Sequence, residues 1–307
     1  GISVEIKAFG EIYRTLKEIN PNIAHFVTIK PVLYGGIASR FLSIHKKVFS
    51  ISGLGFIFIK QGLKATLVRM LIKTMYKFAL GGKNSHVIVQ NPDDKAVVNS
   101  IVKVPITLIR GSGVDLSQYE YKEENNGNVK VSMACRLLKD KGVFEYIDAV
   151  KILKQKLPNV EFELYGDIDI HNPASLTSDD VEKIKKEGFV NVYGFSIDIA
   201  KVFCDSNIVV LPSYREGLPK VLIEAAACGR AVVTTDVPGC RDAIEPNVTG
   251  LLCEVKDIES LARMIEKLII DEKLRNRMGY EGRKLAEQEF DINKVVEKHF
   301  DIYEGRI

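Results

Sequence analysis

The sequence predicts an α/β protein with two parallel sheets, each covered by helices. Short β-branched runs alternate with longer amphipathic stretches along most of the 307 residues, the order that parallel strands with helical crossovers require. A polar segment, "YKEENNGN" at 121–128, interrupts this alternation, and the charge balance changes sign near the same place. Together these observations predict two Rossmann-like domains facing across a ligand cleft.

The charge asymmetry suggests different tasks for the two domains. Residues 1–110 contain 16 Lys and Arg side chains against 5 Asp and Glu, a balance of +11, whereas the remaining residues have a balance of −8. The first domain is therefore expected to face an anionic partner. We place an N-terminal domain at 1–114, a C-terminal domain at 115–290, and a final helix at 291–307 that packs back toward the N-terminal domain.

The first domain has four strand candidates and three helix candidates. The strands are expected at 23–28, 47–52, 86–90 and 105–109. The helices are expected at 34–44, 56–80 and 93–101. Four strands are few for a doubly wound sheet. We therefore expect that the first strands of this domain are missing, or that another part of the chain covers the open edge.

The second domain repeats the alternation with six strands. These are expected at 129–134, 160–165, 190–193, 208–211, 231–234 and 251–253. Helices are expected at 142–155, 179–187, 196–204, 220–228 and 258–270, with helical segments continuing to about 303.

Composition argues against several classes of protein. No apolar run reaches the roughly 18 residues that a membrane-spanning helix needs, and the opening "GISVEIKAFG" lacks a signal-peptide pattern. The five cysteines include no Cys-x-x-Cys pair, which favours free thiols in a reducing compartment. The histidines show no metal-ligand spacing. We expect a cytoplasmic protein that needs neither a metal nor a nucleic-acid partner.

The segment "ACRLLKDKGV" places two cations directly after a predicted strand. Arg136 and Lys141 precede the next helix, at the strand end where doubly wound folds bind ligands. Two cations beside a helix N-terminus can hold a diphosphate, because backbone N–H groups and the helix dipole add to their charge. The alternative is that both are ordinary solvated surface cations.

The segment "REGLPKVLIEAA" predicts a helix start that faces a ligand. Pro219 suits the first turn of a helix, where its missing N–H is no loss. The N–H groups of Gly217, Leu218 and Lys220 would then point toward an anion. Gly217 would also let a ligand approach the backbone.

Two glutamates flank this helix start. Glu216 precedes the helix, and Glu224 is the one charged residue between 221 and 228. We expect the two carboxylates to reach different parts of one ligand. Glu224 is suited to accept hydrogen bonds from the vicinal hydroxyls of a ribose. The alternative for Glu224 is a position on the polar edge of an amphipathic helix.

Three further motifs carry weaker signals. "GDIDI" holds Asp167-x-Asp169, a spacing that can bind a metal, but no further oxygen ligand is fixed nearby, so a polar loop is favoured. "GGK" at 81–83 lacks the rest of a P-loop. No familiar nucleophile motif is present.

The stretch 56–80 predicts a basic amphipathic helix. Its cations recur at steps of four or five residues: Lys60, Lys64, Arg69, Lys73 and Lys77. Such a helix fits an anionic membrane surface. A helix packed on the core with a solvated basic side is the alternative, and the positive balance of the first domain favours the membrane.

The combination of these motifs resembles the retaining glycosyltransferases of family 4, which have the GT-B fold. It rests on Glu216-x7-Glu224 with Gly-Leu-Pro, the following "ACGRAVVTTDVPGCRD", and Arg136-x4-Lys141. The likeness is strong over 105–290 and weaker over the first 100 residues, through "PNIAHFVTIKPVLYGGIASR" and "SISGLGFIF". Those two stretches look most like the branch that builds bacterial capsule, O-antigen and other lipid-linked glycans.

The resemblance implies a role for each charged residue. Arg136 and Lys141 would hold the donor diphosphate, and Glu216 would contact the donor sugar; these three are the expected catalytic residues. Glu224 would accept hydrogen bonds from the ribose. A retaining reaction by same-face departure and attack needs no enzyme nucleophile, and catalysis would rest on positioning and on charge stabilisation without a metal.

The resemblance also implies the remaining donor contacts. Backbone groups at Gly217, Leu218 and Pro219 would help to bind the donor, and the loop at Gly194 and Phe195 would frame the base. Two departures stand out. The family's first strand and glycine-rich loop would precede Gly1. The histidine that many members carry near the reacting sugar is replaced by the sequence "SGLG" at 52–55.

These observations lead to one hypothesis and two rivals. The leading hypothesis is a peripheral enzyme on the cytoplasmic face of the membrane that moves a sugar from a UDP-sugar to a lipid-linked or polysaccharide acceptor, with no cofactor besides the donor. A sugar-nucleotide epimerase shares the two-domain layout. The second rival is a non-catalytic remnant of such an enzyme, which would bind a nucleotide sugar without transferring it.

Overall fold

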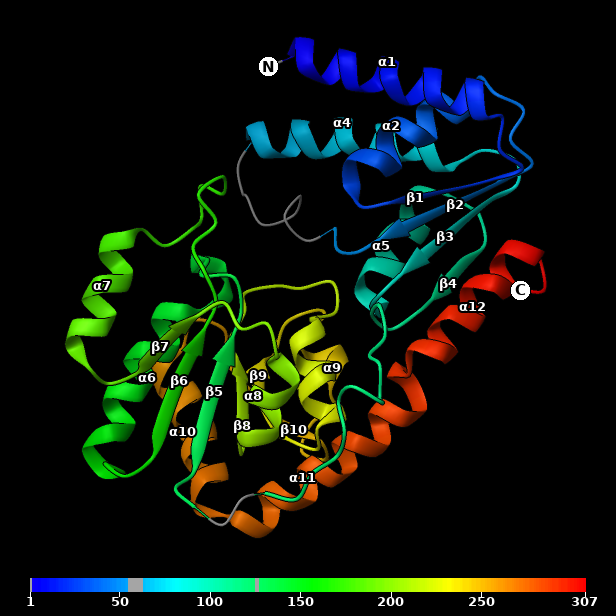
Figure 1. Ribbon diagram of the computed structural model, residues 1–307. Helices are drawn as coiled ribbons and strands as arrows, with labels where there is room; N and C mark the ends of the chain where they lie inside the picture. The colour runs from blue at the N-terminus through cyan, green and yellow to red at the C-terminus, as the bar shows by residue number, and fades with distance from the viewer. Residues whose placement is uncertain (1, 55–62, 125–126) are drawn as a thin grey trace. The chain divides into compact units, whose positions relative to one another are not determined.

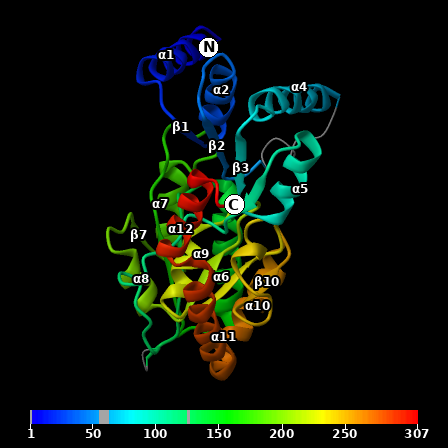
Figure 2. The ribbon, with the colours of Figure 1, turned by 90° about the vertical axis from the view of Figure 1, so that its right-hand side faces the viewer.

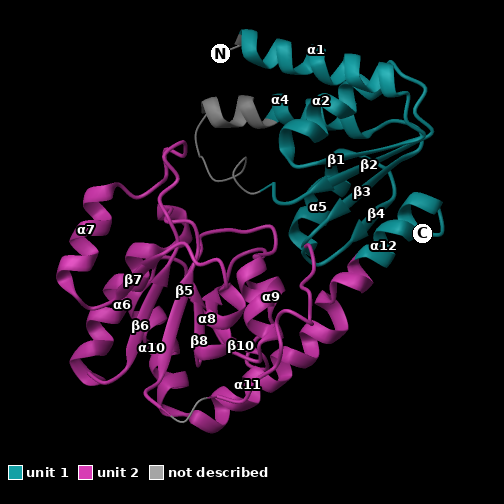
Figure 3. Cartoon of the chain, in the orientation of Figure 1, with its two compact units in different colours: residues 1–111, 296–307 teal, residues 112–295 magenta. Residues whose placement is uncertain are grey.

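Figure 1 shows the computed structural model of the chain, in which residues 2–54, 63–124 and 127–307 are described, with side chains left out at 2 and 63–69. The chain forms two compact units (Figure 3). Unit 1 contains residues 1–111 and 296–307, and unit 2 contains residues 112–295. No helix in the described ranges is long and apolar enough to cross a membrane.

Unit 1 is built around a parallel sheet of four strands in the order β1-β2-β3-β4. Its elements are α1 (Ile2–Ile19), β1 (Ile23–Val27), α2 (Ile29–Ser39), β2 (Lys46–Ile51), α4 (Leu63–Leu80), β3 (Ser85–Val89), α5 (Pro92–Ile101) and β4 (Ile106–Leu108). β3 is buried along its whole length, as expected for a central strand covered on both faces. Its side chains join one hydrophobic core with those of β2, α2 and α4.

Two features of unit 1 differ from the sequence-based expectation, and one further expectation lies outside the described residues. The pattern assigns no element before residue 23, and helix α1 occupies that stretch and packs against α2, which lies between α1 and α4 (Figures 1 and 2). Helix α2 begins and ends five residues earlier than predicted. Pro31 lies in its first turn, where the missing N–H removes no helical bond. The predicted start of the basic helix, 56–62, lies outside the described residues.

A histidine cluster joins the C-terminal residues of unit 1 to β1. His25 Nδ1 lies 2.7 Å from the Tyr303 hydroxyl, and Nε2 lies 2.6 Å from Ser50 Oγ on β2. The His299 ring lies 5.9 Å away, centroid to centroid. Burial, with a smaller contribution from His299, lowers the pKa of His25 to about 4. His25 is therefore neutral at pH 7 and has both ring nitrogens occupied.

Unit 2 contains a parallel sheet of six strands in the order β10-β9-β8-β5-β6-β7. The strands are β5 (Lys130–Ala134), β6 (Glu161–Tyr165), β7 (Asn191–Gly194), β8 (Ile208–Leu211), β9 (Ala231–Thr235) and β10 (Gly250–Cys253). The order reverses beside β5, which runs to β6 on one side and pairs with β8 on the other. Such a switch point is where doubly wound folds bind ligands.

The helices cover both faces of this sheet. They are α6 (Val143–Lys156), α7 (Ser178–Glu187), α8 (Ile199–Asp205), α9 (Lys220–Ala227), α10 (Ile258–Ile270) and α11 (Glu272–Leu285), with 3₁₀ turns at Lys139–Lys141 and Arg241–Ala243 and a π-helical turn at Ala286–Phe290. The last helix, α12 (Ile292–Glu304), belongs to unit 1 from residue 296 onward. Right-handed crossovers in opposite directions place α6 and α9 on opposite faces. Accordingly α10 packs on α6, whereas α8 and α11 pack on α9.

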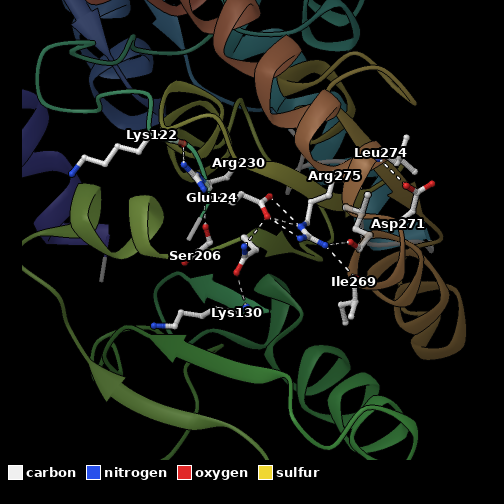
Figure 4. A network of polar contacts seen from close by, with 11 residues as sticks. Lys122, Glu124, Lys130, Ser206, Arg230, Ile269, Asp271, Leu274 and Arg275 are labelled. Carbon is white, nitrogen blue, oxygen red and sulfur yellow. Dashed lines mark hydrogen bonds and ion pairs between the residues drawn. The ribbon is translucent and has the colours of Figure 1, made fainter. Parts of the chain in front are cut away.

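The segment before β5 is fixed to unit 2 by two buried arginines (Figure 4). Arg230 is fully buried and donates to the backbone carbonyls of Cys228, Ser206 and Lys122. Arg275 donates from Nε to both oxygens of Glu124, at 3.0 and 2.9 Å. These contacts hold 122–124 at the amino ends of the strands, the edge opposite the switch-point ligand position.

Candidate functional site

A pocket of about 620 Å³ opens at the carboxyl ends of three strands of unit 2. Its walls come from the segments that directly follow β5, β6 and β7, from the first two turns of α9, and from Tyr119. This is the position that the reversal of strand order predicts for a ligand. Among the predicted site residues, Arg136, Phe195 and Glu224 line this pocket.

Glu224 is a buried carboxylate at the inner end of the pocket. Its residue surface is 5% exposed, and it lies in the second turn of α9. The Tyr119 hydroxyl donates to its Oε1 at 2.8 Å, and Lys220 Nζ lies 3.3 Å from the same oxygen. These partners and the nearby helix N-terminus offset the cost of burying the charge. Burial and the adjacent carboxylate raise the pKa of Tyr119, which remains a hydrogen-bond donor.

The start of α9 keeps backbone donors available. Pro219 stands at the N-cap position with φ −72°, and no side chain caps the helix. The Leu222 N–H donates to the Pro219 carbonyl at 3.1 Å. The N–H groups before it have no partner within the helix, so this end of α9 presents donors and a partial positive charge. Leu218, just before it, is buried and belongs to the core. Gly217 precedes both, in the loop from β8.

Arg136 faces the pocket from the segment after β5. Its side chain is 63% exposed, and Nη1 lies 3.1 Å from Oδ2 of Asp169, which follows β6. An exposed ion pair of this kind contributes little to stability, so a phosphate can replace the carboxylate at small cost. The predicted polar loop at 167–169 therefore supplies the resting partner of Arg136.

Lys141 and Glu216 form a second group, beside the pocket but not on its lining. Lys141 Nζ lies 2.5 Å from Glu216 Oε1, and Ser213 Oγ donates to the same oxygen at 2.7 Å. The side chains of Lys141 and Glu216 are 18% and 13% exposed. The two expected diphosphate cations thus have different partners, and Lys141 is held by the carboxylate assigned to the sugar.

One glycine fixes the backbone at Glu216. Gly239 has φ +83°, and a Cβ there would collide with the carbonyl oxygen of Glu216. The Glu216 N–H in turn donates to the carbonyl of Pro238 at 3.2 Å. Sequence reasoning missed Gly239, although "VPG" lies in the quoted motif. It also missed Tyr119 and Ser213, since nothing in their local sequence marks a contact with Glu224 or Glu216.

The mouth of the pocket is apolar. Phe195, Ile170 and Ile197 line it and are 73%, 80% and 95% exposed. Gly194, at the end of β7, has φ +73°, and its carbonyl accepts from the N–H of Gly166 at 2.7 Å. This bond joins the loops after β6 and β7. Large exposed apolar side chains at the rim of a pocket indicate a surface that an apolar part of a ligand can cover.

No cluster of three or more His, Cys, Asp or Glu side chains suited to a metal ion occurs among the residues that the structure describes. Asp167 and Asp169 both line the pocket, with Asp169 engaged by Arg136 as described above.

The sequence matches two protein-family models. Residues 118–285 match the family described as "Glycosyl transferases group 1", and residues 3–91 match "Glycosyl transferase 4-like". The first match covers more than half of the chain, so this protein belongs to the group 1 glycosyl transferases. This confirms the family predicted from the motifs around Glu216 and Arg136.

Two curated relatives match nearly the whole chain. The N,N'-diacetylbacillosaminyl-diphospho-undecaprenol alpha-1,3-N-acetylgalactosaminyltransferase of Campylobacter jejuni is 30% identical, over 98% of this chain and 81% of its own length. The capsular polysaccharide biosynthesis glycosyltransferase CapM of Staphylococcus aureus is 27% identical, over 97% of this chain and 82% of its own length. The protein is a glycosyltransferase.

Solved structures confirm the predicted GT-B fold class. Sucrose-phosphate synthase from Thermosynechococcus elongatus superposes with a TM-score of 0.82 at 22% identity, over 97% of this chain and 77% of that one. Anabaena HepE in complex with UDP superposes with a TM-score of 0.74 at 19% identity, over 97% and 82%.

Proposed function

We propose that this glycosyltransferase moves a sugar from a UDP-sugar to a lipid-linked glycan acceptor, with retention of anomeric configuration and without a metal. The observation that carries the proposal is the pocket at the strand reversal of unit 2. It combines a buried carboxylate, Glu224, with a cation, Arg136, and an uncapped helix start. A nucleoside diphosphate needs a hydrogen-bond acceptor for its ribose, which Glu224 supplies. It also needs positive charge for its two phosphates, which Arg136 and the helix start supply.

The donor can be placed along the pocket by its chemistry. The base lies at the apolar mouth by Gly194 and Phe195, and the ribose hydroxyls donate to Glu224. The diphosphate replaces Asp169 as the ion-pair partner of Arg136 and lies over the N–H groups at the start of α9. The sugar then lies toward Lys141 and Glu216, the group beside the pocket.

The chemistry follows from this arrangement. As the bond between the anomeric carbon and the diphosphate breaks, negative charge develops on the departing phosphate oxygen. Arg136, Lys141 and the start of α9 stabilise that charge. Glu216 holds the sugar hydroxyls and keeps Lys141 positioned. The acceptor hydroxyl attacks the anomeric carbon on the face that the diphosphate leaves and passes its proton to the departing phosphate oxygen. This gives retention and requires no enzyme nucleophile, and no cofactor besides the donor is required.

The acceptor is inferred from the relatives. The Campylobacter jejuni enzyme is named for a diphospho-undecaprenol acceptor, and it shares most of its length with this chain. An acceptor of this kind resides in a membrane, so we place the protein at the cytoplasmic face of one. Helix α4 exposes Met70, Leu71, Lys77 and Phe78, which recur at the spacing of one helical face. Lys60, and the side chains of Lys64 and Arg69, lie outside the described residues.

The activity is tested by incubating the protein with a panel of UDP-sugars and an undecaprenyl-diphosphate glycan in anionic vesicles. NMR of the product gives the anomeric configuration, and the reaction is repeated in EDTA. Glu216→Gln is expected to lose transfer, whereas Glu182→Gln, on the exposed side of α7, keeps it. A product with inverted configuration, or activity lost in EDTA and restored by a divalent cation, would contradict the proposal. Donor epimerisation without acceptor would instead favour an epimerase.

A further inference from the structure

Unit 1 holds a group of positive charges that the glycosyltransferase site does not use. It lies where the loop before β2 and the turn after α4 meet, at the amino ends of β2 and β3. Arg40 directly follows α2, Lys47 is the second residue of β2, and Ser85 is the first residue of β3. The turn between α4 and β3 contains Gly82, from the "GGK" sequence that is not a P-loop.

Three donor atoms converge on one point in this group. A Cβ built on Gly82 would lie 3.0 Å from Arg40 Nη1, 3.2 Å from Ser85 Oγ and 3.3 Å from Lys47 Nζ. These distances show that the three donor atoms lie close to one another against the Gly82 backbone, where a side chain would crowd them. Arg40 is held from the other side by the Phe78 ring, 5.1 Å from its guanidinium carbon.

Two of the three donors, Lys47 and Ser85, are buried, whereas Arg40 is exposed. Lys47 is 8% exposed and Ser85 is 5% exposed. Ser85 Oγ has no hydrogen-bond partner, and within the described ranges burial and Arg40, with no carboxylate, act on the charge of Lys47. A buried ammonium beside a second cation is unfavourable by itself. Burial and the neighbouring Arg40 lower the pKa of Lys47, which is the sign expected when the balancing charge is absent.

The surroundings extend this positive field. A groove of about 700 Å³ begins at Arg40 and is lined by Lys77, Phe78 and Lys103. As far as the structure describes it, the lining of this groove includes three cations and no acidic side chain. A ligand in this groove therefore meets three cations and one aromatic ring.

We propose that Arg40, Lys47 and Ser85 form a binding site for a phosphate group, cradled over Gly82 at the amino edge of the unit 1 sheet. A tetrahedral oxyanion accepts from all three donors at once and neutralises the two cations. The phosphate belongs either to a soluble molecule or to a lipid headgroup whose remainder lies along the groove. The site is independent of the donor pocket, which is built from unit 2, so this proposal stands apart from the function proposed above.

The test measures phosphate binding by calorimetry and thermal unfolding, with inorganic phosphate compared against chloride at equal ionic strength. Lys47→Met and Ser85→Ala remove donors, and Gly82→Ala fills the cradle. Lys83→Gln, an exposed cation in the same turn, is the matched control. Arg136→Gln in parallel reports any phosphate held by unit 2. We expect Lys47→Met to weaken binding about tenfold or more, and the control by less than about twofold.

Stability separates a binding role from a structural one. If Lys47 binds phosphate, Lys47→Met removes a repulsion, so the phosphate-free variant unfolds at the same temperature as the parent or higher. If Lys47 only supports the fold, the variant unfolds at a lower temperature and keeps the parent's phosphate affinity. That second result overturns the proposal, as does an unchanged affinity in both Lys47→Met and Gly82→Ala.

Vesicles identify the source of the phosphate. Flotation is compared on vesicles of phosphatidic acid, which exposes a phosphomonoester, and on phosphatidylserine vesicles of matched charge. Selective loss of phosphatidic acid binding in Lys47→Met assigns the site to a lipid headgroup. Loss of soluble phosphate binding with unchanged flotation assigns it to a soluble phosphate. If neither measurement changes, the site does not exist.

Discussion

Replacement of Glu224 tests the assignment of the ribose site most directly. Oε1 of Glu224 lies 2.8 Å from the Tyr119 hydroxyl and 3.3 Å from Lys220 Nζ. Among the described residues, no hydrogen-bond or ion-pair partner contacts Oε2. Oε2 is therefore the oxygen expected to accept from a ribose hydroxyl. A hydrogen bond to a charged group contributes about 1.5–3 kcal/mol, and Glu224→Ala removes one or two of them. We expect UDP binding to weaken by about 2–4 kcal/mol, or about 30- to 1,000-fold.

The assay compares two ligands. Calorimetry with UDP and competition with uridine separate the ribose from the diphosphate. Glu224→Ala weakens both ligands by the same factor, whereas Arg136→Gln weakens UDP alone. Glu224→Gln keeps an acceptor for Tyr119 and loses only the charge, so its effect is intermediate and its fold is preserved. Glu182→Gln serves as the unaffected control.

Two results would refute this reasoning. A folded Glu224→Ala protein that binds UDP within about threefold of the parent would show that the carboxylate does not contact the ligand. A loss for UDP without a loss for uridine would place Glu224 at the diphosphate instead. Thermal unfolding of each variant shows that a loss of binding does not come from loss of the fold.

Three further predictions concern stability and turnover. Glu124→Gln leaves the buried guanidinium of Arg275 without its counter-charge, and should lower the free energy of unfolding by about 3–5 kcal/mol in urea titrations. His25 has a pKa of about 4 in the folded chain against 6.5 in the unfolded one, so its contribution is complete above pH 6.5. That contribution, about 3 kcal/mol, disappears as the pH falls from 6.5 to 4, and His25→Gln should flatten the pH dependence of unfolding. Gly239→Ala should displace Glu216 and lower kcat about 100-fold, while UDP affinity by calorimetry changes little.

Each of these has a control or a contrary outcome. Glu266→Gln breaks an exposed pair with Lys156 and should cost less than about 1 kcal/mol. If Glu124→Gln lowers the free energy of unfolding by no more than Glu266→Gln does, burial of the Glu124–Arg275 pair is unimportant for stability. An equal free energy of unfolding for the parent at pH 7 and pH 5 would show that His25 does not contribute to the pH dependence of stability. Full turnover by Gly239→Ala would show that the loop at Glu216 adapts to a side chain.

Much of the fold could be predicted from the sequence because parallel strands leave a strong local record. β8 and β9 are buried at every position, and such strands read as unbroken apolar runs between helical patterns. All six strands of unit 2 lie within a few residues of the expected ranges. Helix α2 begins before its predicted start, and Pro31 lies in its first turn, where the missing N–H removes no helical bond.

The site was predictable only in part, for a physical reason. Glu224 stands out because a charge among apolar helix residues is costly unless a ligand or partner meets it. Arg136 and Glu216 stand out because they lie at a strand end and before a helix start, where doubly wound folds bind ligands. By themselves, then, the residues determined the alternating architecture, the family and the charged side chains that the chemistry requires. Tertiary structure decided their partners: Tyr119 reaches Glu224 across 105 positions, Lys141 reaches Glu216 across 75, and Arg40, Lys47 and Ser85 meet over Gly82. Such contacts depend on which strands are neighbours in the sheet, and a local sequence pattern carries no record of strand order.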